Sequence, residues 1–211
     1  MDQIEKDLKR IKGVNRAALR EVILSACDWD PSCYYQGLHD LCAVILRYNG
    51  GRKGKAMRQA RMIANLYLRD YLHKESLLDA LEPRFKRIEQ ILRREGHSLA
   101  APPLFMTSWL LTWFSHDTPT PLPIFHFLMQ SPDPSHRLLY LSAAFFIHQR
   151  DRIVDDEGEM HQVLKTIPGR TRNLKKVFAE CQRLESKKRP KYFLFILIFL
   201  VSLLLLLRRR R

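Results

Sequence analysis

Two short polar motifs near the start of the chain hold the side chains best suited to act on a bound partner. In "IEKDLKR", Asp7 precedes Arg10 by three residues, so on a helix its carboxylate can orient the planar guanidinium. Gln36 follows in "SCYYQGLHDLC", and a side-chain amide can accept one hydrogen bond while it donates another. Taken alone, the first motif is typical of a surface ion pair, and the glutamine is an ordinary surface residue unless a reacting partner lies beside it.

The hydrophobic pattern around these motifs predicts helices along almost the whole chain. Asn15 is placed to cap a helix over 16–26, and Pro31 separates it from a helix over 38–48. Pro83 is expected at the start of a helix that ends near Gly96. The other expected helices cover residues 4–11, 55–81, 104–116, 124–130, 136–151, 159–166 and 171–187. No alternating polar and apolar run of strand length stands out, so the sequence predicts an all-α fold.

The basic charge of the chain is concentrated near its C-terminal end. The formal net charge is +14, but residues 165–211 hold 14 Lys and Arg against two acidic residues, which leaves the first 164 residues nearly neutral. This distribution does not favour nucleic-acid binding, which more often uses a basic face on the folded domain.

An apolar segment explains this charge pattern. Residues 192–207 form an uncharged run of 16 residues between "KKRPK" and "RRRR", and as a helix it would be roughly 24 Å long. Snorkelling of Lys191 and Arg208 can extend it toward the thickness of a bilayer core. The sequence therefore predicts a transmembrane tail anchor over 192–207, preceded by a basic juxtamembrane helix or linker over 169–191.

Several other features have structural explanations. "GGRKGKA" at 50–56 lacks the spacing and the Ser/Thr of a phosphate-binding loop, so a flexible basic connector is expected. The eight histidines form no close ligand pair, the four cysteines form no zinc motif, and "DDEGE" at 155–159 lacks calcium-loop spacing, so no metal site is expected. Trp109 and Trp113 are expected to pack in the core, and the thiols to stay reduced and idle.

The two polar motifs, taken in order, resemble the TBC domain of Rab GTPase-activating proteins. Members of that family carry Ile-x-x-Asp-x-x-Arg and then Tyr-x-Gln-Gly or Tyr-Gln-Gly, matched here by Ile4, Asp7, Arg10, Tyr35, Gln36 and Gly37. Later stretches, "SWLLTWF" among them, resemble the second half of the domain, and the resemblance covers roughly residues 4–167. The chain looks most like the tail-anchored endoplasmic-reticulum members, so we expect a multi-helix TBC domain over 1–168, shortened at its N-terminus, plus a C-terminal transmembrane helix.

The resemblance implies a role for each motif residue. Arg10 would neutralise charge on the phosphoryl group transferred in a Rab-bound GTP, and Gln36 would orient the attacking water. Asp7 would orient Arg10, Tyr35 would support the loop by packing, and Gly37 would let the backbone come close. The chain would then contribute catalytic residues to hydrolysis by a Rab rather than act as a stand-alone enzyme. It would need no metal or cofactor of its own, since the Rab binds GTP and Mg²⁺.

Departures from the family pattern motivate a second hypothesis. Only three residues precede the arginine motif, fewer than is usual, and a different alignment would place Lys6 or Lys9 at the site in place of Arg10. The alternative is a non-catalytic, tail-anchored TBC-like scaffold that binds a Rab. A role in vesicle traffic at the endoplasmic reticulum is favoured, and a short anchor with a basic tail also suits mitochondrial or peroxisomal membranes. No motif indicates which Rab is bound or the oligomeric state.

Overall fold

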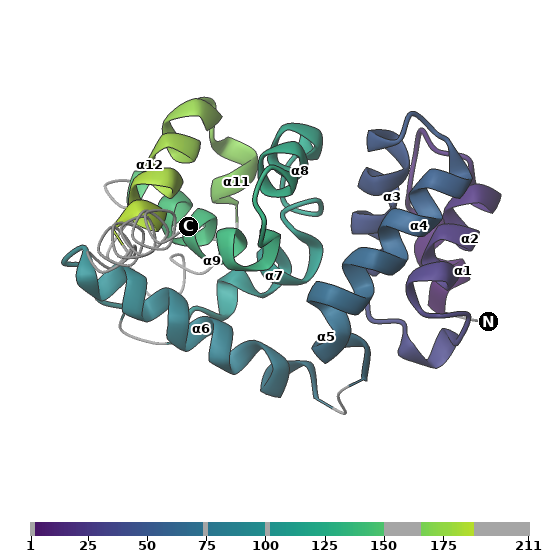
Figure 1. Cartoon of the computed structure of the whole chain (residues 1–211), viewed down its shortest axis with the longest axis horizontal. Coiled ribbons are helices and arrows are strands. Elements are labelled where there is room, and N and C mark those ends of the chain that lie inside the picture. The colour runs from purple at the N-terminus through teal and green to yellow at the C-terminus, as the bar shows by residue number, and fades with distance from the viewer. Residues whose placement is uncertain (1–2, 74–75, 100–101, 150–165, 188–211) are drawn as a thin grey trace, which may run out of the picture.

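The computed structural model describes residues 3–73, 76–99, 102–149 and 166–187, and within these ranges every regular element is helical (Figure 1). This agrees with the all-α prediction. The elements, in chain order, are α1 (Gln3–Leu8), α2 (Arg16–Ala26), the 3₁₀ turn η1 (Pro31–Cys33), α3 (Leu38–Tyr48), α4 (Lys53–Ile63), the π-helical segment η2 (Ala64–Leu68), α5 (Arg69–His73), α6 (Leu77–Arg94), the 3₁₀ turn η3 (Leu104–Met106), α7 (Thr107–Thr112), α8 (Pro121–Met129), α9 (Pro134–Gln149), α11 (Ile167–Arg170) and α12 (Leu174–Ser186).

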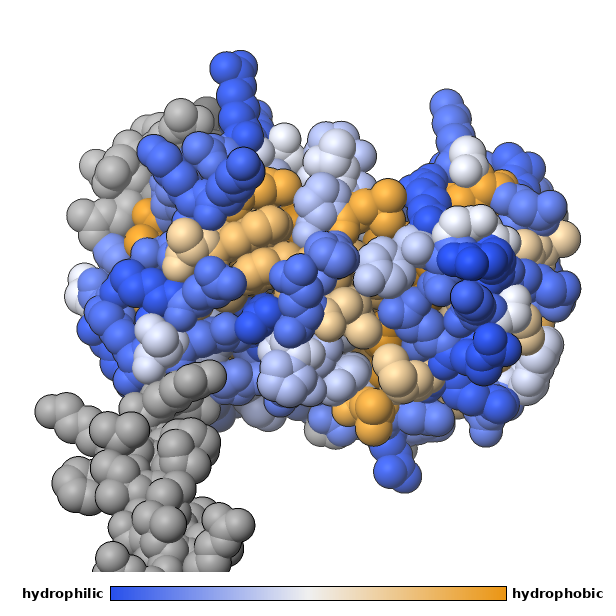
Figure 2. All heavy atoms as spheres, turned by 45° about the horizontal axis from the view of Figure 1, so that its top comes forward, coloured by the Kyte–Doolittle hydropathy of each residue, from blue (hydrophilic) through white to orange (hydrophobic). Residues whose placement is uncertain are grey.

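The helices lie in two groups, which Figure 1 shows side by side with α5 between them. In the first group, α1 to α4, helix α2 packs against α3 and α4. In the second group, α6 to α12, helix α9 contacts α6, α7, α8 and α12. Helix α3 contacts α7 and α8 and so connects the two groups. Figure 2 shows one face of the molecule, where hydrophobic residues gather over the second group and hydrophilic residues dominate the first.

Aromatic side chains fill the core of the second group. The rings of Trp109 and Phe114 stack with centroids 5.4 Å apart, and Phe114 lies 4.9 Å from Phe145. Trp109 and Trp113 are 0% and 1% exposed, which confirms that both belong to the core. Side chains of this size dominate core energetics, so they fix α7 firmly on α9.

The ends of α2 and α3 follow the capping signals of the sequence. The Asn15 side chain accepts a hydrogen bond of 2.9 Å from the Ala18 backbone N–H, as expected of an N-cap. Gly50 and Gly51 have positive φ in the turn after α3. The prediction of a flexible connector over 50–56 is wrong for its second half, because α4 already begins at Lys53.

Pro83 does not begin a helix, contrary to the prediction, but lies inside α6. The helix begins at Leu77 because the Ser76 hydroxyl accepts a bond of 3.4 Å from the Asp79 N–H. Its buried side continues across the proline through Leu81, Phe85 and Ile88. A proline removes one backbone donor and clashes with the preceding turn. The helix nevertheless continues across Pro83, and the Arg84 guanidinium donates to the Ala80 carbonyl in the same turn.

The predicted helix over 104–116 also stops early. Helix α7 ends at Thr112, because Trp113 and Phe114 adopt left-handed φ values of 52° and 66°. Such a conformation costs roughly 1–2 kcal/mol per residue, and burial of both aromatic rings offsets it. The chain turns sharply here, and this turn places His116 beside α3.

No helix within the described residues is long and apolar enough to cross a bilayer. Two predicted features lie outside the described residues, namely the anchor over 192–207 and the acidic stretch at 155–159. Of the helix expected over 159–166, the described residues include only Thr166. Helix α12, which falls in the stretch predicted as a juxtamembrane helix or linker, packs on α9 and buries Val177, Cys181 and Leu184.

Candidate functional site

A cavity of about 550 Å³ between the two helical groups is lined by both residues predicted to act on a Rab-bound GTP, Arg10 and Gln36, which are called the two fingers below. Both side chains are exposed. The "IEKDLKR" motif has three basic positions, and of Lys6, Lys9 and Arg10 the described cavity lining includes Arg10 alone. The wall from the second group is formed by Leu77, Leu104, Phe105, Thr107, Ser108, Leu111, Thr112 and His116.

The ion pair predicted between Asp7 and Arg10 is present. Arg10 lies just past the end of α1, with its backbone N–H bonded to the Asp7 carbonyl at 3.0 Å. Its Nη1 is 3.4 Å from Asp7 Oδ1, and the two side chains are 68% and 0% exposed respectively. A buried carboxylate therefore anchors one side of a guanidinium that otherwise projects into solvent.

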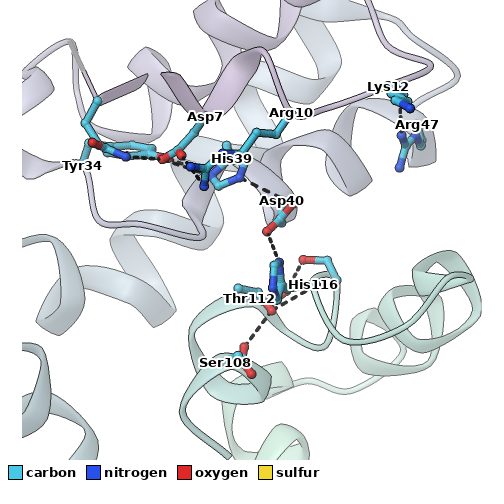
Figure 3. Close-up of polar contacts among 12 residues, drawn as sticks. Asp7, Arg10, Lys12, Tyr34, His39, Asp40, Arg47, Ser108, Thr112 and His116 are labelled. Carbon is cyan, nitrogen blue, oxygen red and sulfur yellow. Dashed lines mark hydrogen bonds and ion pairs between the residues drawn. The ribbon is translucent and has the colours of Figure 1, made fainter. Parts of the chain in front are cut away.

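Further contacts fix the turn that carries Arg10. Arg47 on α3 donates a hydrogen bond of 2.7 Å to the Lys12 carbonyl (Figure 3). The Arg16 guanidinium reaches the Lys9 carbonyl at 3.5 Å. The carbonyls on both sides of Arg10 are thus tied to α2 and α3, so its backbone position is set by the first helical group.

Two further side chains hold the Asp7 carboxylate. The Tyr34 hydroxyl and the Gln3 amide donate to Oδ2 at 2.8 and 3.0 Å. Burial alone would raise the pKa of Asp7, but these hydrogen bonds, with the charges of His39 and Arg10, lower it below its ordinary value. The carboxylate is therefore anionic at neutral pH.

Gln36 is held by its neighbours Tyr35 and Gly37, which both contact α7. The Tyr35 ring is buried, and its hydroxyl donates a 2.9 Å hydrogen bond to the Leu111 carbonyl. Gly37 has φ +107°, and a Cβ there would lie 2.8 Å from Thr112 Cγ2. Tyr35 is thus packed against α7, and the absence of a Cβ at Gly37 lets the loop approach Thr112 closely. Their roles in catalysis stay predictions.

A polar chain that sequence reasoning missed links the two sides of the cavity (Figure 3). His39 Nδ1 is 2.7 Å from the Tyr34 oxygen, and its Nε2 is 3.6 Å from Asp40 Oδ1. The other oxygen of Asp40 is 2.9 Å from His116 Nδ1. Tyr34 could have been found, because in "YYQG" it is the tyrosine of Tyr-x-Gln-Gly. His116 could not, since it lies 76 residues from Asp40.

The buried members of this chain have shifted pKa values. Burial lowers the pKa of His39 despite the opposing charges of Asp40 and Asp7, so its imidazole is neutral at neutral pH. Burial and the bond to Asp7 raise the pKa of Tyr34, which keeps its proton. Within the described residues no group of three or more His, Cys, Asp or Glu is arranged to hold a metal ion.

The chain belongs to the Rab-GTPase-TBC domain family, whose profile matches residues 1–154. It is similar to TBC1 domain family member 20 of Mus musculus, with 26% identity over 164 residues. The proteins of the same name from Bos taurus and Homo sapiens are each 25% identical over 164 residues. Each match covers 71% of this chain and 39% of the relative, so the chain spans about two fifths of the length of these relatives.

Proposed function

We propose that this chain is a GTPase-activating protein for a Rab-family GTPase, to which it supplies Arg10 and Gln36 in trans. The observation that carries the proposal is that a cation and a side-chain amide, both exposed, line one cavity on a domain of the Rab-GTPase-TBC family. Exposure matters, because each group must leave its own surface and enter the nucleotide site of another protein.

The two groups match the two requirements of GTP hydrolysis. Charge on the transferring phosphoryl group must be neutralised, and an arginine supplied in trans contributes roughly 10³–10⁵ in rate, or about 4–7 kcal/mol. A water must also be oriented for in-line attack, which an amide can do by accepting from the water while donating to phosphate. GTP and Mg²⁺ are bound by the Rab in this proposal, so the chain needs no cofactor of its own.

A membrane location is the second part of the proposal. The apolar run 192–207 with its basic flanks is proposed to anchor the chain in a bilayer, with the endoplasmic reticulum favoured, where it would regulate vesicle traffic. Anchoring on the surface that carries a lipidated Rab would raise the effective concentration of the two proteins. Deletion of 192–207 is expected to move the chain from the pellet to the supernatant when membranes are washed with alkaline carbonate.

The catalytic proposal is tested by phosphate release from a panel of GTP-loaded Rabs mixed with the full chain. Arg10→Ala and Gln36→Ala are each expected to reduce the stimulation of the responsive Rab at least 100-fold, given the rate contribution of such an arginine. Arg10→Lys is expected to restore little, because lysine lacks the planar fork. Arg94→Ala and Gln90→Ala, at exposed positions of α6, are the matched controls and should behave as wild type.

The outcome also separates the proposal from its alternative. A wild-type chain that binds a GTP-loaded Rab without accelerating phosphate release would be a scaffold. Stimulation that survives both finger substitutions would refute the assignment of Arg10 and Gln36.

A further inference from the structure

We propose that Tyr34 and His39 are positioning residues that hold Arg10 through Asp7, and that protonation of His39 releases the guanidinium. The inference rests on the proposed function of Arg10 and adds a regulation of the same site. Neither side chain needs to contact the nucleotide, because both act through the carboxylate that orients Arg10.

The first step is that Arg10 depends on one oxygen of Asp7. Asp7 Oδ2 is occupied by the Tyr34 and Gln3 donors at 2.8 and 3.0 Å. Oδ1 is fully buried, makes no hydrogen bond within the described residues, and faces Arg10 Nη1 at 3.4 Å. The position of that oxygen, and the negative charge on it, therefore decide where the guanidinium points.

The second step is the direction of the hydrogen bonds. Asp7 is an anion and can only accept, so the single Tyr34 proton is donated to it. The Tyr34 oxygen must then accept from His39 Nδ1 at 2.7 Å, which makes the Nδ1–H tautomer the neutral form of His39. The lone pair of its Nε2 is left on the side of Asp40 and the cavity.

The third step is what a second proton does at that Nε2. An imidazolium at His39 places a positive charge 3.8 Å from Asp7 Oδ2 and 3.6 Å from Asp40 Oδ1, where it competes with Arg10 for Asp7 and repels the guanidinium. The groups that face His39 are Asp7 and Arg10 from the α1 end, Tyr34 from the loop, Asp40 from α3 and His116 from the turn after α7. Burial opposes the second proton, so it binds only below the ordinary His pKa of about 6.5.

The network also reaches the other finger. Asp40, which faces His39 on one side, contacts His116 on the other at 2.9 Å, and His116 follows the helix that holds the Gln36 loop through Tyr35. Contacts therefore connect His39 to both walls of the cavity.

The kinetic test compares wild type, His39→Gln and Tyr34→Phe across pH 5.5 to 8. At each pH, the rate of Rab GTP hydrolysis stimulated by each protein is divided by the rate stimulated by the Arg10→Ala variant. Wild-type stimulation is expected to fall roughly tenfold below pH 6.5, the effect of weakening one charged contact. His39→Gln keeps a donor for Tyr34 and should be flat with pH. Tyr34→Phe should lower kcat roughly tenfold at pH 8 with little change in KM, and should stay at that level as the pH falls, where the wild type joins it. Tyr48→Phe, at the exposed end of α3, should match wild type at each pH.

The second readout needs no Rab. Arginine side-chain ¹⁵N NMR of the full chain in detergent should show restricted rotation of the Arg10 guanidinium at pH 7.5 and free rotation at pH 5.5. Tyr34→Phe should free it at both pH values, and His39→Gln should leave it restricted at both. A wild-type chain without Rab stimulation but with this NMR behaviour would refute the proposed function and keep the positioning network. An Arg10 signal that ignores Tyr34, His39 and pH would overturn the inference, whatever the kinetics.

Discussion

Replacing Gly37 by alanine is expected to destabilise the chain by about 2–6 kcal/mol, because two separate penalties add at this position. The first is backbone strain, since a residue with a Cβ at φ +107° costs about 1–3 kcal/mol. The second is crowding, since the new methyl carbon would lie 2.8 Å from Thr112 Cγ2, and overpacking costs about 1–3 kcal/mol. Thr112 is buried on α7, so it has little freedom to move away.

A second substitution separates the two penalties. Thr112→Ser removes Cγ2 but keeps the hydroxyl, which donates to the Ser108 carbonyl at 2.7 Å. Alone it should cost about 1 kcal/mol for one buried methyl group. Combined with Gly37→Ala it removes the crowding, so the double variant should be more stable than the sum of the single effects by about 1–3 kcal/mol.

The measurement is urea unfolding of the full chain, followed by helical circular dichroism at constant detergent. At about 2–4 °C per kcal/mol for a chain of this length, Gly37→Ala should also lower the Tm by 4 °C or more. Rab stimulation should fall with it, since Gln36 is the preceding residue, and should recover in part in the double variant. Additive single effects, within about 0.5 kcal/mol, would show that Gly37 and Thr112 do not meet as described.

Three further predictions follow from the buried polar groups. Tyr35→Phe leaves the Leu111 carbonyl buried without its donor and should cost about 1–3 kcal/mol in urea unfolding. Because the folded pKa of Asp7 is lowered, its carboxylate stabilises the fold above its unfolded pKa of about 3.9. That contribution is lost as the pH falls from there through the folded pKa, so stepwise acid titration should show wild type losing its advantage over Asp7→Asn. Cys33 is half-buried and should react with a maleimide before the other three thiols when peptides are analysed by mass spectrometry, because those are buried and burial raises the pKa of Cys27 to about 12.

The sequence predicts local features of this fold well, because their causes are local. The Asn15 cap and the end of α3 at glycines depend on residues within one turn of each other. The Asp7–Arg10 ion pair likewise needs only a spacing of three residues, and it forms even though α1 ends before Arg10. Pro83 shows the limit of this reasoning, because α6 continues across it along a buried side that no single-residue signal reveals.

Features set by distant partners escape sequence reasoning for the opposite reason. The left-handed turn at Trp113 and Phe114 violates local preference and forms because both rings are buried in the core of the second group. This turn brings His116 to Asp40 across 76 residues, and no periodicity encodes that contact. The convergence of Arg10 and Gln36 on one cavity was expected from family resemblance, and the polar chain behind them was not.

Tyr34 and Tyr35 connect the loop before α3 to both sides of the cavity. Adjacent residues in this extended loop point to opposite sides, and the two hydroxyls accordingly bond in opposite directions, Tyr34 to Asp7 behind Arg10 and Tyr35 to the Leu111 carbonyl of α7. The backbone between them leads directly to Gln36, so a shift of the loop that strengthened one bond would strain the other. Two hydrogen bonds from consecutive residues therefore tie this loop to the Asp7–Arg10 pair on one side and to α7 on the other. Tyr34→Phe should therefore disturb Arg10 first, and Tyr35→Phe should disturb Gln36 first. Double-mutant cycles that combine each tyrosine variant with Arg10→Ala and with Gln36→Ala would measure which pairs are coupled.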